Sequence, residues 1–578
     1  MQTTTAPVRK HPQGLPYLFF TEMWERFGYY LMLGIFVLYM IDVDRGGLAI
    51  ADKISYDVFG TFIALTYLTP FLGGFLADKA LGYIKSVYIG GTLMGLGYLL
   101  LGFPVLRAFG MDVSQDAVMT SFYTAVGLIV VGNGFFKPSI STLLGNLYSY
   151  PQFKERKDWG YNLFYMGINI GALFGPILAA FMRNKYSWSA AFITAGVGMF
   201  IGLIVFSMGI KYIRPGERKE MIAAGTLDAA GEKGGSSIRQ VLGAVFLPAM
   251  VAGAIGWFLP GMVLGGTLLD SQSTDAFLFA AIPVVIFYVS LWAKAGAGEK
   301  RPIAALLAVF AVSIVFWAVF KQNGTALTNW AKYYTDRQIT GPAQPLAVGL
   351  YQTEKLSPLP EKVSVYDEQF RAEKDEAGKV KKEVGQHIYF RNLPAEKIPA
   401  DGSPVYVASP ELFQAINPAW VILLTPLVVA VFAALRKRGK EPTTPSKIAI
   451  GLLISALSTL VMVLAVQASL NGAVKVSAWY LIFTYGVVTV GELCLSPMGL
   501  SLVSKLSPPR FTALMMGGFF LSTSIGNKLS GVLAGLWYGY ENKANFFLVN
   551  SILLLAAALM AFAMLRWLNR VMAEKGVK

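Results

Sequence analysis

Long apolar segments recur along this chain, and they restrict its fold more than any other feature. A hydrocarbon core about 30 Å thick is crossed by a helix of roughly 20 residues, and about fourteen segments reach that length. Of all residues, 55% are hydrophobic and only 14% are charged, a composition typical of polytopic membrane proteins. Because a helix satisfies its own backbone hydrogen bonds in lipid, the sequence predicts an all-α membrane protein.

The apolar segments fall into groups of six, two and six, and a long polar insert interrupts the last group after its first span. The predicted N-terminal six-helix bundle is 1–213, and a cytoplasmic linker with two extra spans follows at 214–300. The predicted C-terminal six-helix bundle is 301–330 with 413–578, and the insert is 331–412. Within the insert, the runs 363–366 and 387–390 predict a small hairpin, with a disordered loop as the alternative.

Lysine and arginine gather in alternate short loops, such as 154–157 and 436–438. By the positive-inside rule these loops, and with them both termini, lie in the cytoplasm, so the insert lies on the opposite, external side. The loops also account for much of the net charge of +15, so no nucleic-acid partner is expected. The single cysteine, Cys494, lies in an apolar segment, which excludes an intrachain disulfide and a cysteine-based metal site. We therefore expect no metal and no cofactor.

The first apolar segment, 15–41, carries charge inside it. Ionisable groups at membrane depth are costly and usually mark function. At 3.6 residues per turn, six positions share one stripe of the helix: Glu22, Glu25, Arg26, Tyr29, Tyr30 and Leu33. Two carboxylates, a guanidinium and two phenols on one stripe predict a binding site that handles protons.

This stripe resembles the E-x-x-E-R-F-x-Y-Y signature of the proton-dependent oligopeptide transporter family. Residues 164–173 resemble its fifth-helix F-Y-x-x-I-N-x-G motif, 132–138 its fourth-helix lysine motif, and 491–497 its acidic segment in the tenth core helix. The loop 73–82 is similar to the loop motif of the major facilitator superfamily, in which small residues allow helices to approach closely and Asp78 can cap or pair.

The resemblance implies a major facilitator fold in a bacterial inner membrane, with two six-helix bundles, two extra helices between them and substrate bound between the halves. It also implies transport of di- and tripeptides with protons. We expect a monomer whose partners are peptides, protons and the lipid bilayer.

A dipeptide is a zwitterion with charged ends roughly 6 to 7 Å apart, so its site needs a cationic and an anionic pole. Arg26 and Lys137 are predicted to form the cationic pole, and Glu492 is predicted to bind the peptide amine. Amides and phenols are expected to contact the peptide backbone and to form the walls; these are Asn169, Asn417, Tyr29, Tyr30 and Tyr67.

Proton coupling is predicted for Glu22, Glu25, Arg26 and Lys137. Both histidines lie outside the spans, so protons must travel on carboxylates and water. A peptide carboxylate that competes for Lys137 would leave Glu25 free to take a proton. The alternatives are structural: Lys137 only neutralises Glu25, Glu22 is permanently paired with Arg26, Glu492 only packs helices together, or the tyrosines and asparagines only form hydrogen bonds between helices.

The expected external gate departs from the family. Relatives commonly place an arginine at the position of Leu33 and an acid at the position of Lys321. An ammonium in an apolar helix is costly unless it is paired. Asp57, near the external end of the second span, is the predicted partner of Lys321. The alternatives are that Lys321 snorkels outward or stays neutral.

The chain is thus expected to be a proton-coupled peptide importer that works by alternating access, and not an enzyme. It has no G-x-x-x-x-G-K-[ST] loop for ATP and no Ser/His/Asp arrangement within its spans. Two rival functions are a carrier of another anion, such as nitrate, and a non-transporting receptor or sensor that binds its ligand with the insert. An acid at Glu492 argues against an anion carrier, because an anion offers it no amine.

Overall fold

The computed structural model describes residues 11–223, 242–269, 271–508 and 512–575. The first apolar segments are all helical, as expected for segments that have to satisfy their backbone polar groups in lipid. These helices are α1 (Leu15–Ile41), α2 (Asp52–Leu76), α3 (Tyr83–Leu101), α4 (Gln115–Leu147), α5 (Lys157–Lys185) and α6 (Trp188–Ile213).

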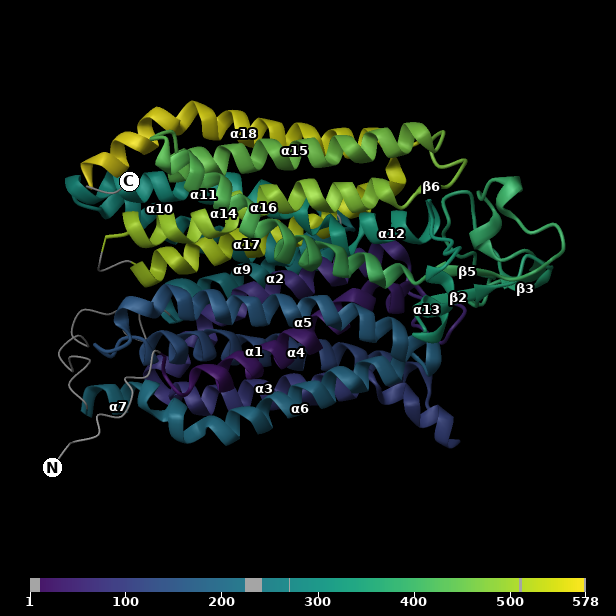
Figure 1. Ribbon diagram of the computed structural model, residues 1–578, viewed down its shortest axis with the longest axis horizontal. Helices are drawn as coiled ribbons and strands as arrows, with labels where there is room; N and C mark the ends of the chain where they lie inside the picture. Colours follow the sequence, from purple (N-terminus) through teal and green to yellow (C-terminus); the bar gives the residue numbers. More distant parts are fainter. Residues whose placement is uncertain (1–10, 224–241, 270, 509–511, 576–578) are drawn as a thin grey trace. The chain divides into compact units, whose positions relative to one another are not determined.

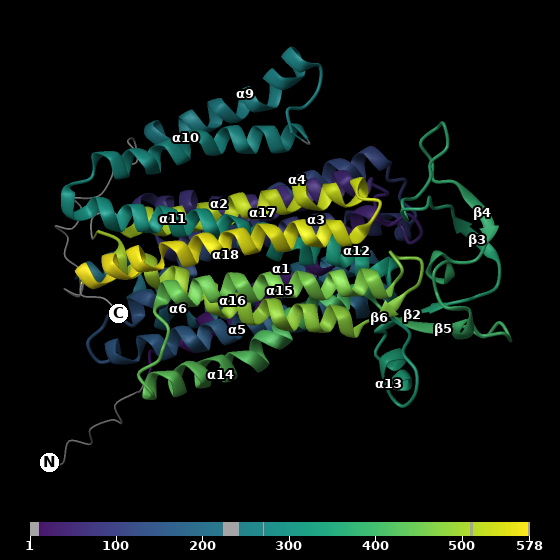
Figure 2. The same ribbon diagram turned by 90° about the horizontal axis from the view of Figure 1, so that it is seen from above.

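Two further helices, α9 (Leu247–Leu264) and α10 (Gln272–Lys294), lie side by side (Figure 2). Six more follow: α11 (Ala297–Phe320), α14 (Ile416–Lys437), α15 (Thr444–Ala468), α16 (Trp479–Leu506), α17 (Thr512–Gly535) and α18 (Lys543–Glu574).

Among the described residues, twelve helices are long and apolar enough to cross a membrane. Two more helices complete the set of fourteen: α1, which carries Glu22, Glu25 and Arg26, and α17, which carries Lys528. The predicted all-α membrane fold is confirmed.

The chain packs as two compact units. Among the described residues, unit 1 comprises 11–32, 68–182 and 189–223, and unit 2 comprises 33–67, 183–188 and the described residues from 242 to 575. Unit 2 therefore includes one end of α1 and of α2, and the junction between α5 and α6. The predicted domain boundaries stay a prediction. Most of the predicted linker, 224–241, lies outside the described residues; a short helix, α7 (Arg218–Ala223), precedes it.

The insert is folded rather than a disordered loop. The helix α12 (Ala326–Tyr333) leads into it, and α13 (Ala343–Gly349) lies within it. Its strands pair as β2 (Thr353–Leu356) with β5 (Val405–Ala408) and β3 (Glu361–Ser364) with β4 (Lys382–Gly385), both antiparallel, while β1 (Thr335–Asp336) pairs in parallel with β6 (Val476–Ser477). In Figure 1 the strands β2, β3 and β5 gather with α13 beyond one end of the helices of unit 2. We call this end the insert end.

The predicted hairpin exists, but its second strand is not 387–390. Val363 lies opposite Glu383 in the β3–β4 pair, whereas Ile388–Phe390 is a 3₁₀ turn. Tyr389 and Phe390 are buried in a small apolar core with Leu356, Leu393, Val405 and Val407. These aromatic side chains both enter one core, which a strand that alternates its faces does not allow. The exposed, charged run at β4 therefore forms the hairpin instead.

The loop motif after α2 behaves as predicted. A side chain at Gly73 would collide with the backbone of Gly134 on α4, so small residues here allow the two helices to approach. Asp78 accepts hydrogen bonds from Tyr83 Oη at 2.7 Å and from Arg218 Nη1 at 2.5 Å. Asp78 therefore ties the loop to the segment that follows α6, within unit 1.

Candidate substrate and proton-coupling site

The charged stripe of α1 forms a buried ion cluster in unit 1. Arg26 Nε lies 2.8 Å from Glu22 Oε1 and 2.7 Å from Glu25 Oε2. The exposed fractions of Glu22, Glu25 and Arg26 are 2%, 0% and 5%. The pair of Glu22 with Arg26 that was an alternative from the sequence is thus formed, and the same guanidinium also pairs with Glu25.

Lys137, on α4, places a second cation close enough to Glu25 for the two charges to interact. Two carboxylates and two cations can therefore balance each other. Several buried polar atoms of this region have no hydrogen-bond partner within the described part of the chain: Glu22 Oε2, Glu25 Oε1, Arg26 Nη2 and Tyr98 Oη. Buried polar atoms normally have partners, so the cluster keeps capacity for a ligand, water or a proton.

Gly171 positions α5 against the cluster. A β-carbon at this residue would lie 2.8 Å from Phe27 N and 3.1 Å from Arg26 Cβ, and it would also meet Met23 O. Gly175, one turn later, would meet Leu31 N at 2.7 Å. The glycine of the fifth-helix motif thus lets α5 lie directly on the backbone of α1. Asn169, in the same motif, donates to Tyr165 O at 2.9 Å.

A Gly171→Val variant should displace α5 from α1 and disturb the ion cluster. Overpacking of this kind costs about 1–3 kcal/mol, so we expect a lower unfolding temperature in detergent and weaker peptide binding. Gly127→Val is the matched control, since a β-carbon at Gly127 meets no atom within 4 Å. Equal unfolding temperatures for the two variants would show that the close approach of α5 is not required.

The predicted tyrosine walls are divided between the two units. Tyr29 and Tyr30 pack edge to face with ring centres 5.4 Å apart, and the guanidinium of Arg26 lies 5.6 Å from the ring centre of Tyr29. Tyr67 belongs to unit 2, where its ring centre lies 6.4 Å from that of Trp317. Tyr29 and Tyr30 are therefore part of the α1 cluster, whereas Tyr67 lies beside Trp317 in unit 2.

The structure brings Asn417 and Glu492 together in unit 2. Asn417 Nδ2 donates to Glu492 Oε2 at 3.2 Å and to Thr489 Oγ1 at 2.8 Å. The Lys321 ammonium lies 5.7 Å from the ring centre of Trp317, and its charge acts on Glu492. Asn417 thus holds the carboxylate of Glu492 in place.

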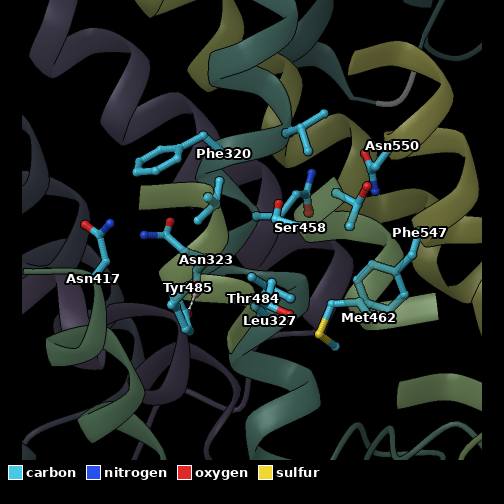
Figure 3. A pocket seen from close by; sticks show the side chains of 14 residues that line it. Phe320, Asn323, Leu327, Asn417, Ser458, Met462, Thr484, Tyr485, Phe547 and Asn550 are labelled. Carbon is cyan, nitrogen blue, oxygen red and sulfur yellow. Dashed lines mark hydrogen bonds between the residues drawn. The ribbon is translucent and has the colours of Figure 1, made fainter. Parts of the chain in front are cut away.

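A cavity of about 30 Å³ adjoins Asn417 within unit 2. Figure 3 shows Asn323, Ser458, Tyr485 and Asn550 among the side chains that line it. The volume is enough for one water molecule, and Asn550 Oδ1 is buried without a hydrogen-bond partner in the described structure. The cavity wall is mostly apolar, with a few polar side chains that can bond a water molecule.

The predicted pair of Asp57 with Lys321 is wrong. Asp57 Oδ1 lies 2.5 Å from the ammonium of Lys528 on α17, whose side chain is fully buried. A β-carbon at Gly60 would lie 3.1 Å from Gly531 Cα, so α2 and α17 cross closely and Lys528 reaches Asp57. Lys321 is half-buried against the rings of Trp317 and Phe320 instead.

The start of α10 and its N-cap residue, Ser271, also contribute to this ion pair. Asp57 accepts hydrogen bonds from Ser271 Oγ at 2.9 Å, Ser273 Oγ at 2.5 Å and Thr274 Oγ1 at 3.1 Å. Leu33, the third predicted gate residue, is half-buried on α1 and adds no charge. Lys528 was missed from the sequence, although an ammonium in an apolar span is the same signal that singled out Lys321.

The chain is similar to known transporters over nearly its whole length. Residues 84–228 and 404–549 match the model of the POT family. The chain is 28% identical over 528 residues to dipeptide and tripeptide permease A of Escherichia coli, which covers 91% of this chain and 85% of the permease. It is 27% identical over 529 residues to the peptide transporter YePEPT of Yersinia enterocolitica, with coverages of 91% and 88%. The crystal structure of the peptide transporter POT in complex with sulfate is similar at 28% identity and a TM-score of 0.70, over 97% of this chain and 96% of that one.

Proposed function

Because the chain belongs to the POT family of transporters, we propose that it is a proton-coupled symporter that imports di- and tripeptides by alternating access. The observation that carries this proposal is the pair of buried charged groups on separate units. Unit 1 holds Arg26 with Glu22 and Glu25, and unit 2 holds Glu492 with Asn417. Relatives named as peptide transporters and permeases support the same substrate class.

The peptide carboxylate is assigned to Arg26 and Lys137. Arg26 Nη2 is buried without a hydrogen-bond partner in the described structure, so the guanidinium can still donate to a carboxylate while its Nε holds Glu22 and Glu25. Glu492 is assigned to the peptide amine, with Asn417 fixing its orientation. Asn169 and the phenols of Tyr29, Tyr30 and Tyr67 are assigned to the peptide backbone and the walls.

Protons are assigned to the α1 carboxylates. Glu25 Oε1 is buried without a donor in the described structure, and burying an unpaired charge is costly. When a peptide carboxylate takes over the cations of the cluster, a proton on Glu25 removes that cost. Substrate and proton therefore bind together.

The same proposal sets the orientation. The cationic loops face the cytoplasm of a bacterial cell, both termini lie on that side, and the insert end faces outward. The carrier acts as a monomer in the inner membrane and needs no cofactor. Asp57 and Lys528 lie at its external gate.

Reconstitution in liposomes tests the function. With an inward proton gradient, labelled dialanine should accumulate, and collapse of the gradient with a protonophore should stop the accumulation. Nitrate should enter no faster than it enters empty liposomes. The peptide assignment fails if nitrate enters and dialanine does not.

A Glu492→Gln variant tests the amine assignment. Loss of a buried charge-assisted contact costs about 2–5 kcal/mol, so we expect the affinity for dialanine to fall at least tenfold. N-acetyl-dialanine has no charged amine, and its weaker binding should be the same in the variant and the wild type. Equal losses for both ligands would mean that Glu492 only packs helices together.

A further inference from the structure

The insert contacts the loop between α1 and α2, 42–51, and the junction between α5 and α6, 183–188, which includes the end of α5. We call these two segments the N-loops. Asp44 accepts hydrogen bonds from Ser364 Oγ at 2.6 Å and from Tyr366 Oη at 3.2 Å. Lys374 Nζ donates to Ala49 O at 3.0 Å. These contacts connect the β3–β4 region of the insert to the loop between α1 and α2, and all of them lie within unit 2.

Arg183, at the end of α5, makes the strongest of these contacts. Its Nε lies 2.7 Å from Glu411 Oε1, and its Nη2 lies 2.6 Å from Glu354 Oε1. The side chains of Arg183 and Glu411 are 5% and 0% exposed. Next to it, Asn184 Nδ2 donates to Ser409 Oγ at 2.7 Å and to Tyr351 O at 2.9 Å. Two carboxylates of the insert thus enclose one guanidinium of the N-loops.

The carboxylate of Glu354 keeps its charge over a wide pH range. Burial alone would raise the pKa of Glu354, but Arg183 and then Arg45 lower it, and the resulting pKa lies well below the usual range. The stabilisation is present above the unfolded pKa of about 4.3 and is lost only as the pH falls through the lower, folded pKa. Near neutral pH this carboxylate therefore stays ionised and paired.

The insert is held to the C-terminal helices in a different way. Phe370 lies in an apolar core with Trp330, Tyr334 and Trp537. Asn392 Nδ2 donates to Tyr333 O and to Gly472 O, both at 3.1 Å, and β1 pairs with β6. This side of the insert is thus fixed by buried aromatic rings and backbone hydrogen bonds.

The two sides of the insert differ in what their separation would cost. Exposing apolar side chains to water loses the favourable free energy of their burial, whereas water that reaches a buried ion pair restores the hydration of both charges and offsets much of the lost attraction. Water already has room at the polar side, because a cavity of about 530 Å³ lies there, lined by Arg45, Asn184, Glu354 and Lys355 among others. The N-loop side is therefore the one that can open.

We propose that the insert is a strap: it stays fixed to the C-terminal helices, holds the N-loops while the insert end is closed, and releases them each time that end opens. Opening here means a stage of the transport cycle, so this inference rests on the proposed carrier function. Its primary contacts are those of Arg183 with Glu354 and Glu411, and of Asp44 with Ser364.

A reversible cross-link tests the strap. In a Cys494→Ala background, Asn184→Cys and Ser409→Cys place two thiols where an amide and a hydroxyl now lie 2.7 Å apart. A short, reducible bifunctional thiol reagent should join them and lower dialanine uptake at least tenfold, and reduction should restore it. The matched control, Asp336→Cys with Ser477→Cys, joins the insert to the C-terminal helices across the β1–β6 pair and should leave uptake unchanged. Full uptake with the first cross-link in place would overturn the proposal.

A second readout needs no substrate, so it separates failure of the strap from failure of the proposed function. Ser524 is fully buried on α17, where its hydroxyl donates to Ala64 O. The Ser524→Cys variant is treated with a membrane-impermeant maleimide, and the labelling rate is measured. Adding Arg183→Gln, or the milder Ser364→Ala, should raise the labelling rate at least fivefold. Lys381→Gln, which breaks an exposed ion pair inside the insert, should not change it. An unchanged rate in both folded test variants would contradict the strap.

Discussion

Arg26→Gln should lower proton-driven dialanine uptake by roughly a hundredfold. The guanidinium balances two buried carboxylates through contacts of 2.8 and 2.7 Å, and it is the proposed partner of the peptide carboxylate. Removing one member of a buried, hydrogen-bonded charge pair costs about 2–5 kcal/mol, and each 1.4 kcal/mol is a factor of about ten. Initial uptake rates in liposomes, normalised to reconstituted protein, measure the effect.

Two further variants show whether this loss concerns the site or the fold. Arg301→Gln removes an exposed arginine that pairs with Glu574 and should transport normally. Arg26→Lys keeps the charge without the two-pronged geometry, so it should retain the unfolding temperature but recover only part of the uptake. If Arg26→Lys transports like the wild type, the geometry of the guanidinium is not needed for the peptide carboxylate.

Lys528→Gln should be the second most damaging substitution. It leaves Asp57 without its cation at the crossing of α2 and α17, and an unpaired buried charge costs about 3–5 kcal/mol. We expect a lower unfolding temperature and a loss of uptake of at least tenfold. Asp57→Asn together with Lys528→Gln should recover part of both, because the remaining serine and threonine hydroxyls from α10 can still bond an amide.

A double-mutant cycle measures the coupling. Groups in direct contact interact by about 0.5–3 kcal/mol, whereas independent sites are additive. Asp57→Asn with Lys528→Gln should therefore be non-additive, and Asp57→Asn with Lys321→Gln should be additive. The reverse result would mean that Asp57 serves Lys321 during transport.

The helices could largely be predicted from the sequence. The first span was expected at 15–41, and α1 is Leu15–Ile41. Long apolar segments leave the chain few alternatives, because a helix forms its hydrogen bonds within the segment. The cluster on α1 was also predictable, since Glu22, Glu25 and Arg26 lie within two turns and their spacing alone places them on one face.

Contacts between distant segments could not be predicted in the same way. Lys528 and Lys321 both lie in apolar helices, and nothing in their local sequence says which one meets Asp57. The choice depends on the close crossing of α2 and α17 at Gly60 and Gly531. Similarly, the sequence does not show that Tyr389 and Phe390 are needed in the core of the insert. Because they lie there, another segment pairs with β3.

The membrane fold, the transporter family and the ionisable residues of the first span can all be predicted from the sequence alone, because each follows from local composition, helical spacing or an uninterrupted motif. The partners of the buried charges, by contrast, depend on how the chain packs: Arg26 pairs with both carboxylates, Asp57 with Lys528, and Arg183 with Glu354 and Glu411. The physical reason is that an ion pair requires side chains to lie within about 4 Å of each other, and helix packing across hundreds of residues of chain sets that distance.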